Sequence, residues 1–327
     1  GPGDFVGCYL TNGTEYLETM LAAFKLRAVP ININYRYVAD ELRYLFADAG
    51  LSAVVCEQQF AANVAEVIAQ VPSVRQVLVV ADDSGDPAPE LAAGSLPGGT
   101  DYESALAAAS ADRPVVNGRS DDDLYVIYTG GTTGMPKGVM WPHRSLLGSS
   151  GATFAAIKAP VPANVDEVSA TVRAFHDRGK AIRILPAAPL MHGTSALTSM
   201  AVLSAGGSVV TLTSPSFDAD ELCAAVQEHA VSQLTIVGDA FARPILDAMS
   251  AADAAGEPYD LTSLRVILSS GVMWSQQSKD ELHRWCTASL ADALVAWRDD
   301  RTTPALDQFV AAVLLGAELG SRAAPAF

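Results

Sequence analysis

One stretch decides the fold of this chain: Tyr128-Thr129-Gly130-Gly131-Thr132-Thr133-Gly134-Met135-Pro136-Lys137-Gly138-Val139. Apolar residues precede it (residues 124–128) and follow it (residues 139–141), so the pattern predicts a strand, a loop and a second strand. Glycines let the backbone approach a ligand closely, and the loop is rich in N–H groups and threonine hydroxyls. Oriented N–H groups form an anion-binding nest, to which Lys137 adds a compact positive charge. The stretch therefore indicates a site for a polyphosphate.

This loop differs from the two common nucleotide loops. A Walker loop needs Ser or Thr after Gly-Lys and opens a helix, whereas Gly138 follows Lys137 here, and the three-glycine dinucleotide spacing is missing as well. The stretch closely resembles the signature of the adenylate-forming enzymes: acyl-CoA synthetases, peptide-synthetase adenylation domains and luciferases. A flexible turn without a ligand is the alternative. The resemblance implies that the phosphates of ATP bind to Thr129, Gly130, Gly131, Thr132, Thr133, Gly134 and Lys137.

The composition restricts the class of protein. The chain has 327 residues, of which 50% are hydrophobic, so it can bury a large core in two or more lobes. A net charge of −16 repels nucleic acid and anionic membranes, so local dipoles, local cations and metal must hold ATP. Four distant cysteines without a Cys-x-x-Cys pair fit the cytoplasm. We see neither a membrane-spanning stretch nor a signal peptide, and the initial Gly1 suggests an internal start.

Alternation along the chain predicts an α/β protein with mostly parallel sheets. We expect strands at residues 5–10, 52–56, 75–81, 124–128, 182–185, 208–212, 233–237 and 264–268, and helices at residues 15–27, 40–49, 58–70, 143–156, 195–203, 218–229 and 240–252. Pro30 is expected to end the first helix. Residues 82–99 read as a surface loop, residues 159–169 as a polar excursion, and residues 288–297 and 305–319 as helix-like.

Three further segments carry candidate site residues. Within Pro189-Leu190-Met191-His192-Gly193, the resemblance implies that His192 shapes the acyl and adenylate pocket rather than acting as a base, and a solvated histidine at a helix entry is the alternative. Ser270 and Gly271 follow a buried strand, where ligands of open sheets bind, and a simple strand-to-helix turn is the alternative. Asp239 lies in the segment Thr235-Ile236-Val237-Gly238-Asp239-Ala240-Phe241-Ala242-Arg243-Pro244. This segment resembles one in bacterial fatty-acyl and steroid-side-chain CoA ligases whose helix lines the acyl tunnel. Asp239 could equally be the N-cap of that helix.

Other enzyme classes find little support in the sequence. There is no Gly-x-Ser-x-Gly elbow for a hydrolase, and no two histidines have metal-ligand spacing. Asp299-Asp300 and residues 121–123 read as solvated acidic turns, so we assign no metal ligand.

The resemblance ends near Arg284. It implies three later features that are not found here: an aromatic-Gly-x-Thr-Glu motif whose Glu holds magnesium, a Thr-Gly-Asp that binds ribose, and a small C-terminal domain with a catalytic lysine. We therefore expect a partial AMP-binding domain at residues 1–284 and an atypical helical tail at residues 285–327, which suggests a truncated product with a shifted reading frame. With those groups missing, ATP binding should be weak and turnover low.

The sequence thus predicts two doubly wound βα lobes from the large N-terminal domain of an adenylate-forming enzyme, without its small domain. The implied reaction is that of an acyl-CoA synthetase, which uses ATP, Mg²⁺ and coenzyme A to activate a fatty or steroid-derived carboxylic acid, with Lys137 and His192 at the catalytic centre. An aryl acid is a further possibility. The alternative function is that of a non-catalytic remnant which binds nucleotide or acyl chains. A peptide-synthetase module is disfavoured because no carrier domain follows.

Overall fold

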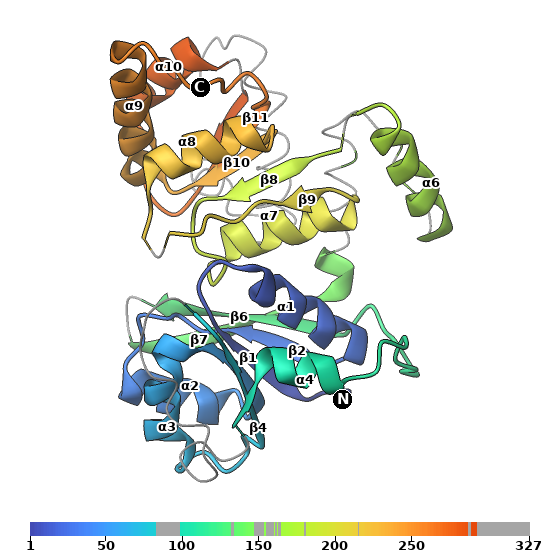
Figure 1. Ribbon diagram of the computed structural model, residues 1–327. Coiled ribbons are helices and arrows are strands. Elements are labelled where there is room, and N and C mark those ends of the chain that lie inside the picture. The colour runs from blue at the N-terminus through green and yellow to red at the C-terminus, as the bar shows by residue number, and fades with distance from the viewer. Residues whose placement is uncertain are drawn as a thin grey trace. The chain divides into compact units, whose positions relative to one another are not determined.

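A computed structural model describes residues 1–82, 99–131, 134–146, 154, 160, 162, 165–179, 181–214, 216–286 and 289–292. The chain forms two compact units, each with its own sheet (Figure 1). Unit 1 contains Gly1–His143 and Leu190–Gly193, and unit 2 contains Arg144–Pro189 and Thr194–Phe327. In the described part of the chain, no helix is long and apolar enough to cross a membrane.

The sheet of unit 1 has the strand order β5-β4-β3-β1-β2-β6-β7 among the described residues. All neighbouring strands are parallel except the last pair, in which β6 and β7 form an antiparallel hairpin. The strands are β1 (Phe5–Tyr9), β2 (Val29–Asn32), β3 (Leu51–Glu57), β4 (Gln76–Val80), β5 (Gly99–Asp101), β6 (Leu124–Gly131) and β7 (Gly134–Pro142). The order reverses at β1, so the chain leaves the carboxyl ends of β1 and β3 in opposite directions, and it is at such a point that ligands of open α/β sheets bind.

Helices cover both faces of this sheet (Figure 1). One face carries α1 (Thr14–Leu26) and α4 (Tyr102–Ala108), and the other carries α2 (Ala39–Asp48), the short 3₁₀ helix η1 (Gln58–Phe60) and α3 (Ala61–Ile68). Leu42, Leu45 and Phe46 recur at helical spacing on α2 and are fully buried against the sheet. Each such side chain contributes about 1.5–3 kcal/mol by leaving water, so this face supplies much of the core of unit 1.

The sheet of unit 2 is parallel throughout its described strands, in the order β12-β11-β10-β8-β9. The helix α7 lies on one face, and α8, α9 and α10 lie on the other (Figure 1). Asp218 caps α8 through the N–H groups of Asp220 and Glu221, and Ser275 caps α10. The elements are β8 (Arg183–Pro186), α7 (Gly193–Ser204), β9 (Ser208–Val209), α8 (Ala219–Glu228), β10 (Gln233–Ile236), α9 (Gly238–Ala254), β11 (Val266–Ser269), α10 (Gln276–Trp285) and β12 (Ser289–Asp292).

The predicted α/β class with two doubly wound lobes is confirmed, but the end of the first helix was wrongly explained. The helix ends at Arg27, which adopts the left-handed conformation (φ 57°) and donates its N–H to the last helical carbonyls. Pro30 lies inside the missed strand β2, where its register partner is Val6. The predicted helix at residues 58–70 is in fact η1 followed by the shorter α3.

Two further expectations were wrong, the first because local end charges favour a helix and the second because strand pairing outweighed local propensity. Residues 165–169, predicted as part of a polar excursion, begin the helix α6 (Val165–His176), with Asp166 and Glu167 in its first turn and Arg173 and His176 in its last. These charges match the helix dipole. Residues 289–292, predicted as helix-like, form β12, which pairs with β11 in parallel. Unpaired backbone groups at the edge of β11 favour such a strand whatever its helix propensity.

Some expectations fall outside the described residues. They concern the loop at residues 82–99, of which residues 83–98 are not described, the middle of the helix expected at residues 143–156, and the helix expected at residues 305–319. Residues 143–146 are helical, as predicted. The strand expected at residues 208–212 is shorter, since β9 ends at Val209.

Candidate active site

The predicted phosphate loop is a β-hairpin with longer strands than expected. β6 runs on to Gly131 and β7 begins at Gly134, so Thr132 and Thr133, which lie outside the described residues, are all that separates them. In the antiparallel register, Thr129 faces Lys137 and Gly131 faces Gly134. Directly opposed residues place their side chains on the same face about 5 Å apart. The hairpin therefore places Thr129 and Lys137 directly opposite each other, with their Cβ atoms on the same face.

Both of these side chains are available to a ligand. Thr129 and Lys137 are exposed, and no carboxylate of the described residues forms an ion pair with Lys137. The ammonium of Lys137 can therefore pair with an anionic ligand. The arrangement suits a phosphate group, which carries negative charge and accepts hydrogen bonds. Gly130, whose surroundings are not described, lies in the same strand.

Tyr128 fixes the base of the hairpin. Its N–H donates to Asn32 Oδ1 (3.1 Å), and its hydroxyl donates to Asp48 Oδ2 (2.7 Å). Burial, and then the acceptor Asp48, raises the pKa of the Tyr128 phenol, which stays protonated. Gly138 is needed opposite because a Cβ there would come within 3.0 Å of the Tyr128 ring and of Val126. The hairpin thus has a defined position on the sheet.

The segment Leu190–Gly193 belongs to unit 1 although its neighbours in sequence belong to unit 2. Its backbone is held by two asparagines: Asn12 Oδ1 accepts from the Leu190 N–H (2.6 Å), and Asn32 Nδ2 donates to the Met191 carbonyl. His192 is exposed. Protein atoms around the ring, and then the cation of Arg36, lower the pKa of His192, so the imidazole is neutral at neutral pH. A neutral ring suits a pocket wall better than an anion-binding cation would.

The turn after β11 is built in unit 2 as the sequence predicts. Ser270 is nearly buried, and its hydroxyl shares a hydrogen bond with the hydroxyl of Thr194. Gly271 has φ +95°, a conformation that other residues rarely adopt. Ser269 Oγ accepts from the Gly238 N–H (2.9 Å) and so ties the turn to the start of α9. These hydrogen bonds hold the turn at the carboxyl end of β11, and ligands of open sheets bind at such ends.

Asp239 has a structural task that differs from the predicted cap. The N-cap of α9 is Val237, without a side-chain cap, and Asp239 lies in the first turn. Its Oδ1 accepts from both N and Oγ of Ser275, each at 3.1 Å. Burial raises the pKa of this carboxyl, but the hydrogen bonds from Ser275 and Ser278 and the charge of Arg243 together lower it. Asp239 therefore joins α9 to the cap of α10, and a substrate role for it remains a prediction.

Further hydroxyl groups, which the sequence did not indicate as site residues, lie on α7 close to this turn. Thr198 Oγ1 lies 3.3 Å from Thr235 Oγ1 and donates to the Thr194 carbonyl (2.7 Å). Ser195 and Ser199 are fully buried, and no described residue is a hydrogen-bond partner of either hydroxyl. Buried hydroxyls usually have partners. The repeat of Thr-Ser pairs four residues apart, at Thr194-Ser195 and Thr198-Ser199, is the signal from which the polar face could have been found.

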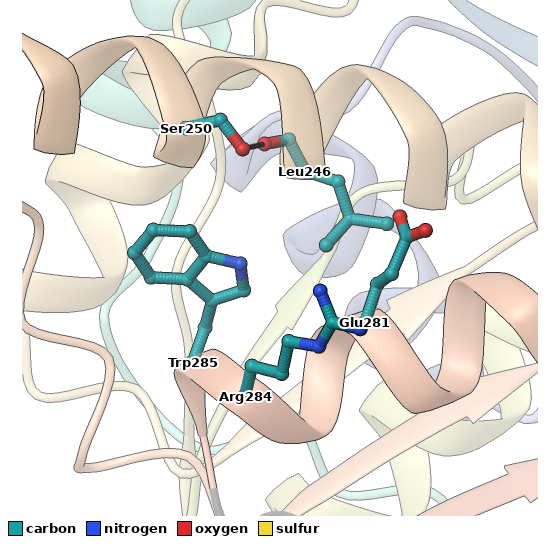
Figure 2. A pocket seen from close by; sticks show the side chains of 5 residues that line it. All are labelled: Leu246, Ser250, Glu281, Arg284 and Trp285. Atoms are coloured by element: carbon teal, nitrogen blue, oxygen red, sulfur yellow. Dashed lines mark hydrogen bonds between the residues drawn. The ribbon is translucent and has the colours of Figure 1, made fainter.

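A depression of about 210 Å³ lies elsewhere in unit 2, between α9 and α10 (Figure 2). Its lining comprises Leu246, Ser250, Glu281, Arg284 and Trp285 and includes none of the predicted site residues. The Ser250 hydroxyl is already used, since it donates to the Leu246 carbonyl (2.8 Å). This depression is therefore not the predicted active site.

The predicted residues fall into two groups. Thr129, Lys137 and His192 belong to unit 1, whereas Asp239, Ser270 and Gly271 belong to unit 2. Within the described ranges, no group of three His, Cys, Asp or Glu side chains could hold a metal ion. We therefore assign no residue of the described ranges, and no step of the reaction, to the expected magnesium.

Comparison with known proteins identifies the family. The AMP-binding enzyme family matches residues 1–295. The chain is 38% identical over 280 residues to the medium-chain acyl-CoA ligase Mig of Mycobacterium avium, covering 85% of this chain and 48% of that protein. It is 37% identical to the 3-oxocholest-4-en-26-oate–CoA ligase of Rhodococcus rhodochrous, with the same coverage of 85% and 48%. The chain thus spans about half the length of these curated relatives.

A solved structure shows the same fold. The N-terminal domain of FACL13 from Mycobacterium tuberculosis, crystallised with an inhibitor, matches with a TM-score of 0.63 at 23% identity, over 90% of this chain and 64% of that one. Together with the family match over residues 1–295, this likeness confirms the resemblance on which the sequence analysis relied. This chain belongs to the AMP-binding enzyme family.

Proposed function

We propose that this chain is the ATP-binding part of an acyl-CoA synthetase acting on a medium- or long-chain fatty acid or a steroid-side-chain acid. The names of the relatives support this substrate class. The observation that carries the proposal is the hairpin, whose register sets Thr129 beside the exposed Lys137. Four buried, free cysteines are compatible with the cytoplasmic location that we expect for such an enzyme.

The proposed reaction has two steps. A carboxylate oxygen attacks the α-phosphorus of ATP, the new P–O bond forms, and the bond to the bridging oxygen breaks as pyrophosphate leaves. The sulfur of coenzyme A then attacks the acyl carbonyl carbon, the thiol proton goes to solvent, and AMP leaves. Lys137 would neutralise phosphate charge in the first step, when two anions approach each other. His192 would border the acyl-adenylate, with Ser270, Gly271 and Asp239 supporting the acyl pocket.

We expect the chain to bind ATP but to release pyrophosphate slowly. In-line phosphoryl transfer usually requires several positive charges around the phosphates. Among the residues assigned to the hairpin, Lys137 is the cation. ATP should therefore bind weakly, and pyrophosphate release should be slow.

The test is pyrophosphate release by the purified chain with ATP, magnesium and a panel of fatty acids and a steroid-side-chain acid. Lys137→Ala should lower any release about 100-fold or more, the scale on which loss of one preorganised charge acts. Lys25→Ala is the matched control because Lys25 is an exposed lysine of α1 and its loss changes the net charge equally. Equal release by Lys137→Ala and the parent chain would refute the assignment of the hairpin. ATP binding without any release would favour a non-catalytic binding protein.

A further inference from the structure

Asn32 is the buried polar residue that joins two parts of unit 1. It ends β2 and is only 3% exposed. Its Oδ1 accepts from the N–H of Tyr128, which opens the phosphate hairpin motif, at 3.1 Å. Its Nδ2 donates to the carbonyl of Met191, the neighbour of His192. One carboxamide therefore contacts both segments that carry predicted site residues of unit 1.

The chemistry of the amide suits this bridge. A carboxamide both donates and accepts, so it can satisfy an N–H on one side and a carbonyl on the other. Both bonds are to backbone, which means that the bridge fixes the position of each segment whatever side chains they carry. The Met191 side chain is 2% exposed, and Leu190 beside it is fully buried. A buried backbone group that is left without a hydrogen-bond partner destabilises the folded chain by about 1–3 kcal/mol.

Sequence separation makes the bridge informative. Asn32 lies 96 residues before Tyr128 and 159 residues before Met191. Asn12 adds a second bond from the same sheet edge, since it accepts from the Leu190 N–H 178 residues later. Local turn chemistry cannot account for bonds of this range, because side chains that serve turns bond within a few residues. The bonds instead hold the His192 segment against the sheet that carries the hairpin.

We propose that Asn32 is a positioning residue for the phosphate hairpin and the His192 segment. By holding the start of the motif in β6 and the carbonyl before His192 through one side chain, it sets the distance between the group that binds phosphate and the ring beside the acyl-adenylate. This inference rests on the proposed function, because it takes the hairpin to be the phosphate site. A displacement of one segment should then shift the other segment as well.

Two variants separate the two bonds. Asn32→Ala removes both. Asn32→Asp is nearly isosteric and keeps an acceptor for the Tyr128 N–H, but it turns an oxygen toward the Met191 carbonyl. Protonation of that carboxyl would restore a donor, so the effect of Asn32→Asp should diminish as the pH falls through the pKa of the introduced group. The Asp variant also keeps the inference testable if Asn32→Ala does not fold.

Asn34→Ala is the matched control. Asn34 lies two residues further on, and its Oδ1 accepts from the Arg36 N–H (2.9 Å) within the same turn. This bond contacts neither the hairpin nor the His192 segment. Loss of the Asn34 side chain should therefore leave both bonds of the Asn32 carboxamide in place.

Hydrogen–deuterium exchange of the full chain tests the bridge directly. In Asn32→Ala, amides of residues 124–129 and of residues 190–193 should both exchange about tenfold faster than in the parent chain, a factor that corresponds to about 1.4 kcal/mol. In Asn34→Ala both segments should keep parental rates. A general loss of stability would instead speed exchange throughout unit 1. Unchanged exchange in either segment of Asn32→Ala would overturn the inference.

Calorimetric titration with ATP and magnesium separates this inference from the proposed function. We expect Asn32→Ala and Asn32→Asp to weaken ATP binding about tenfold and Asn34→Ala to leave it unchanged. If Lys137→Ala abolishes binding while Asn32→Ala binds like the parent, the hairpin stands and the positioning role is refuted. If the parent itself binds no ATP, the proposed function fails, and the exchange experiment alone decides whether Asn32 couples the two segments.

Discussion

The two units hold their predicted site residues by different chemistry. In unit 1, asparagine carboxamides reach backbone groups more than 90 residues away: Asn32 reaches Tyr128 and Met191, and Asn12 reaches Leu190. In unit 2, hydroxyls and one carboxylate connect the ends of neighbouring elements, as Ser269 does with Gly238 and Asp239 with Ser275. Unit 1 thus positions its exposed site segments through asparagine carboxamides, whereas unit 2 builds a turn in which Gly271 adopts a positive φ.

The largest effect is expected from the glycine that opens α9 in unit 2. Gly238 has φ +50°, and a Cβ there would lie 2.4 Å from the Met273 carbonyl oxygen. Gly238→Ala should therefore lower the free energy of unfolding by about 3 kcal/mol, from the left-handed backbone and the backbone clash together. Urea unfolding followed by circular dichroism measures this change.

Gly256→Ala is the control for that experiment. Gly256 has φ +83° but no atom within 4 Å of the added Cβ. It should show only the backbone cost of about 1 kcal/mol. If Gly238→Ala were no worse than Gly256→Ala, close approach at Met273 would not explain why glycine is required at Gly238.

The carboxylate of unit 2 should rank second. Asp239→Ala removes the acceptor for Ser275 and should cost about 2 kcal/mol. Arg243→Ala should cost less than about 0.5 kcal/mol, because its ion pair with Asp239 is exposed and 3.4 Å long. A double-mutant cycle with Ser275→Ala measures the coupling, and full additivity would show that the two side chains do not interact.

The same carboxylate predicts an acid dependence. Because its pKa is lowered below 3.8 in the folded chain, the stability that it contributes is present above that pH and is lost as the pH falls through the folded pKa. Asp239→Ala should remove this part of the acid sensitivity. An unchanged acid transition in the variant would contradict the assignment.

The hairpin of unit 1 should respond more mildly to an added methyl group. Gly138→Ala brings a Cβ to 3.0 Å from the Tyr128 ring and from Val126, both of them side chains that can shift. We expect a loss of about 1 kcal/mol in unfolding free energy. Urea unfolding measures this loss, and a cost of no more than a few tenths of a kcal/mol would show that Tyr128 and Val126 move aside freely.

The smallest effect on stability should come from His143 of unit 1. His143 packs edge-on against Phe24 (ring centroids 4.8 Å apart), and burial lowers its pKa despite the nearby Asp123 and Asp121. The folded pKa lies below the unfolded value of 6.5, so the unfolded chain binds more protons between the two, and stability rises with pH up to about 6.5. In His143→Gln this slope should become shallower. A slope equal to that of the parent chain would exclude His143 as its source.

The sequence by itself determined the family and the hairpin that we propose as the phosphate site. The run from Tyr128 to Val139 combines local features, namely flanking apolar strands, glycines and one lysine, and each of these acts over a few residues. Many strands and helices of both lobes likewise followed from periodicity, as with Leu42, Leu45 and Phe46 on α2, whereas β2, α6 and β12 did not. Such information is local, and for that reason it can be found by inspection of the sequence.

Only the tertiary structure decided which side chains position the predicted site residues within each unit. Nothing near Asn32 in the sequence indicates that its carboxamide reaches Tyr128 and Met191, because sheet order brings those segments to the end of β2. The partnership of Asp239 with Ser275 replaced the local cap that the sequence suggested. β12 formed where helix was expected, since pairing with β11 outweighs local propensity. Long-range hydrogen bonds and strand pairing depend on topology, which local patterns do not encode.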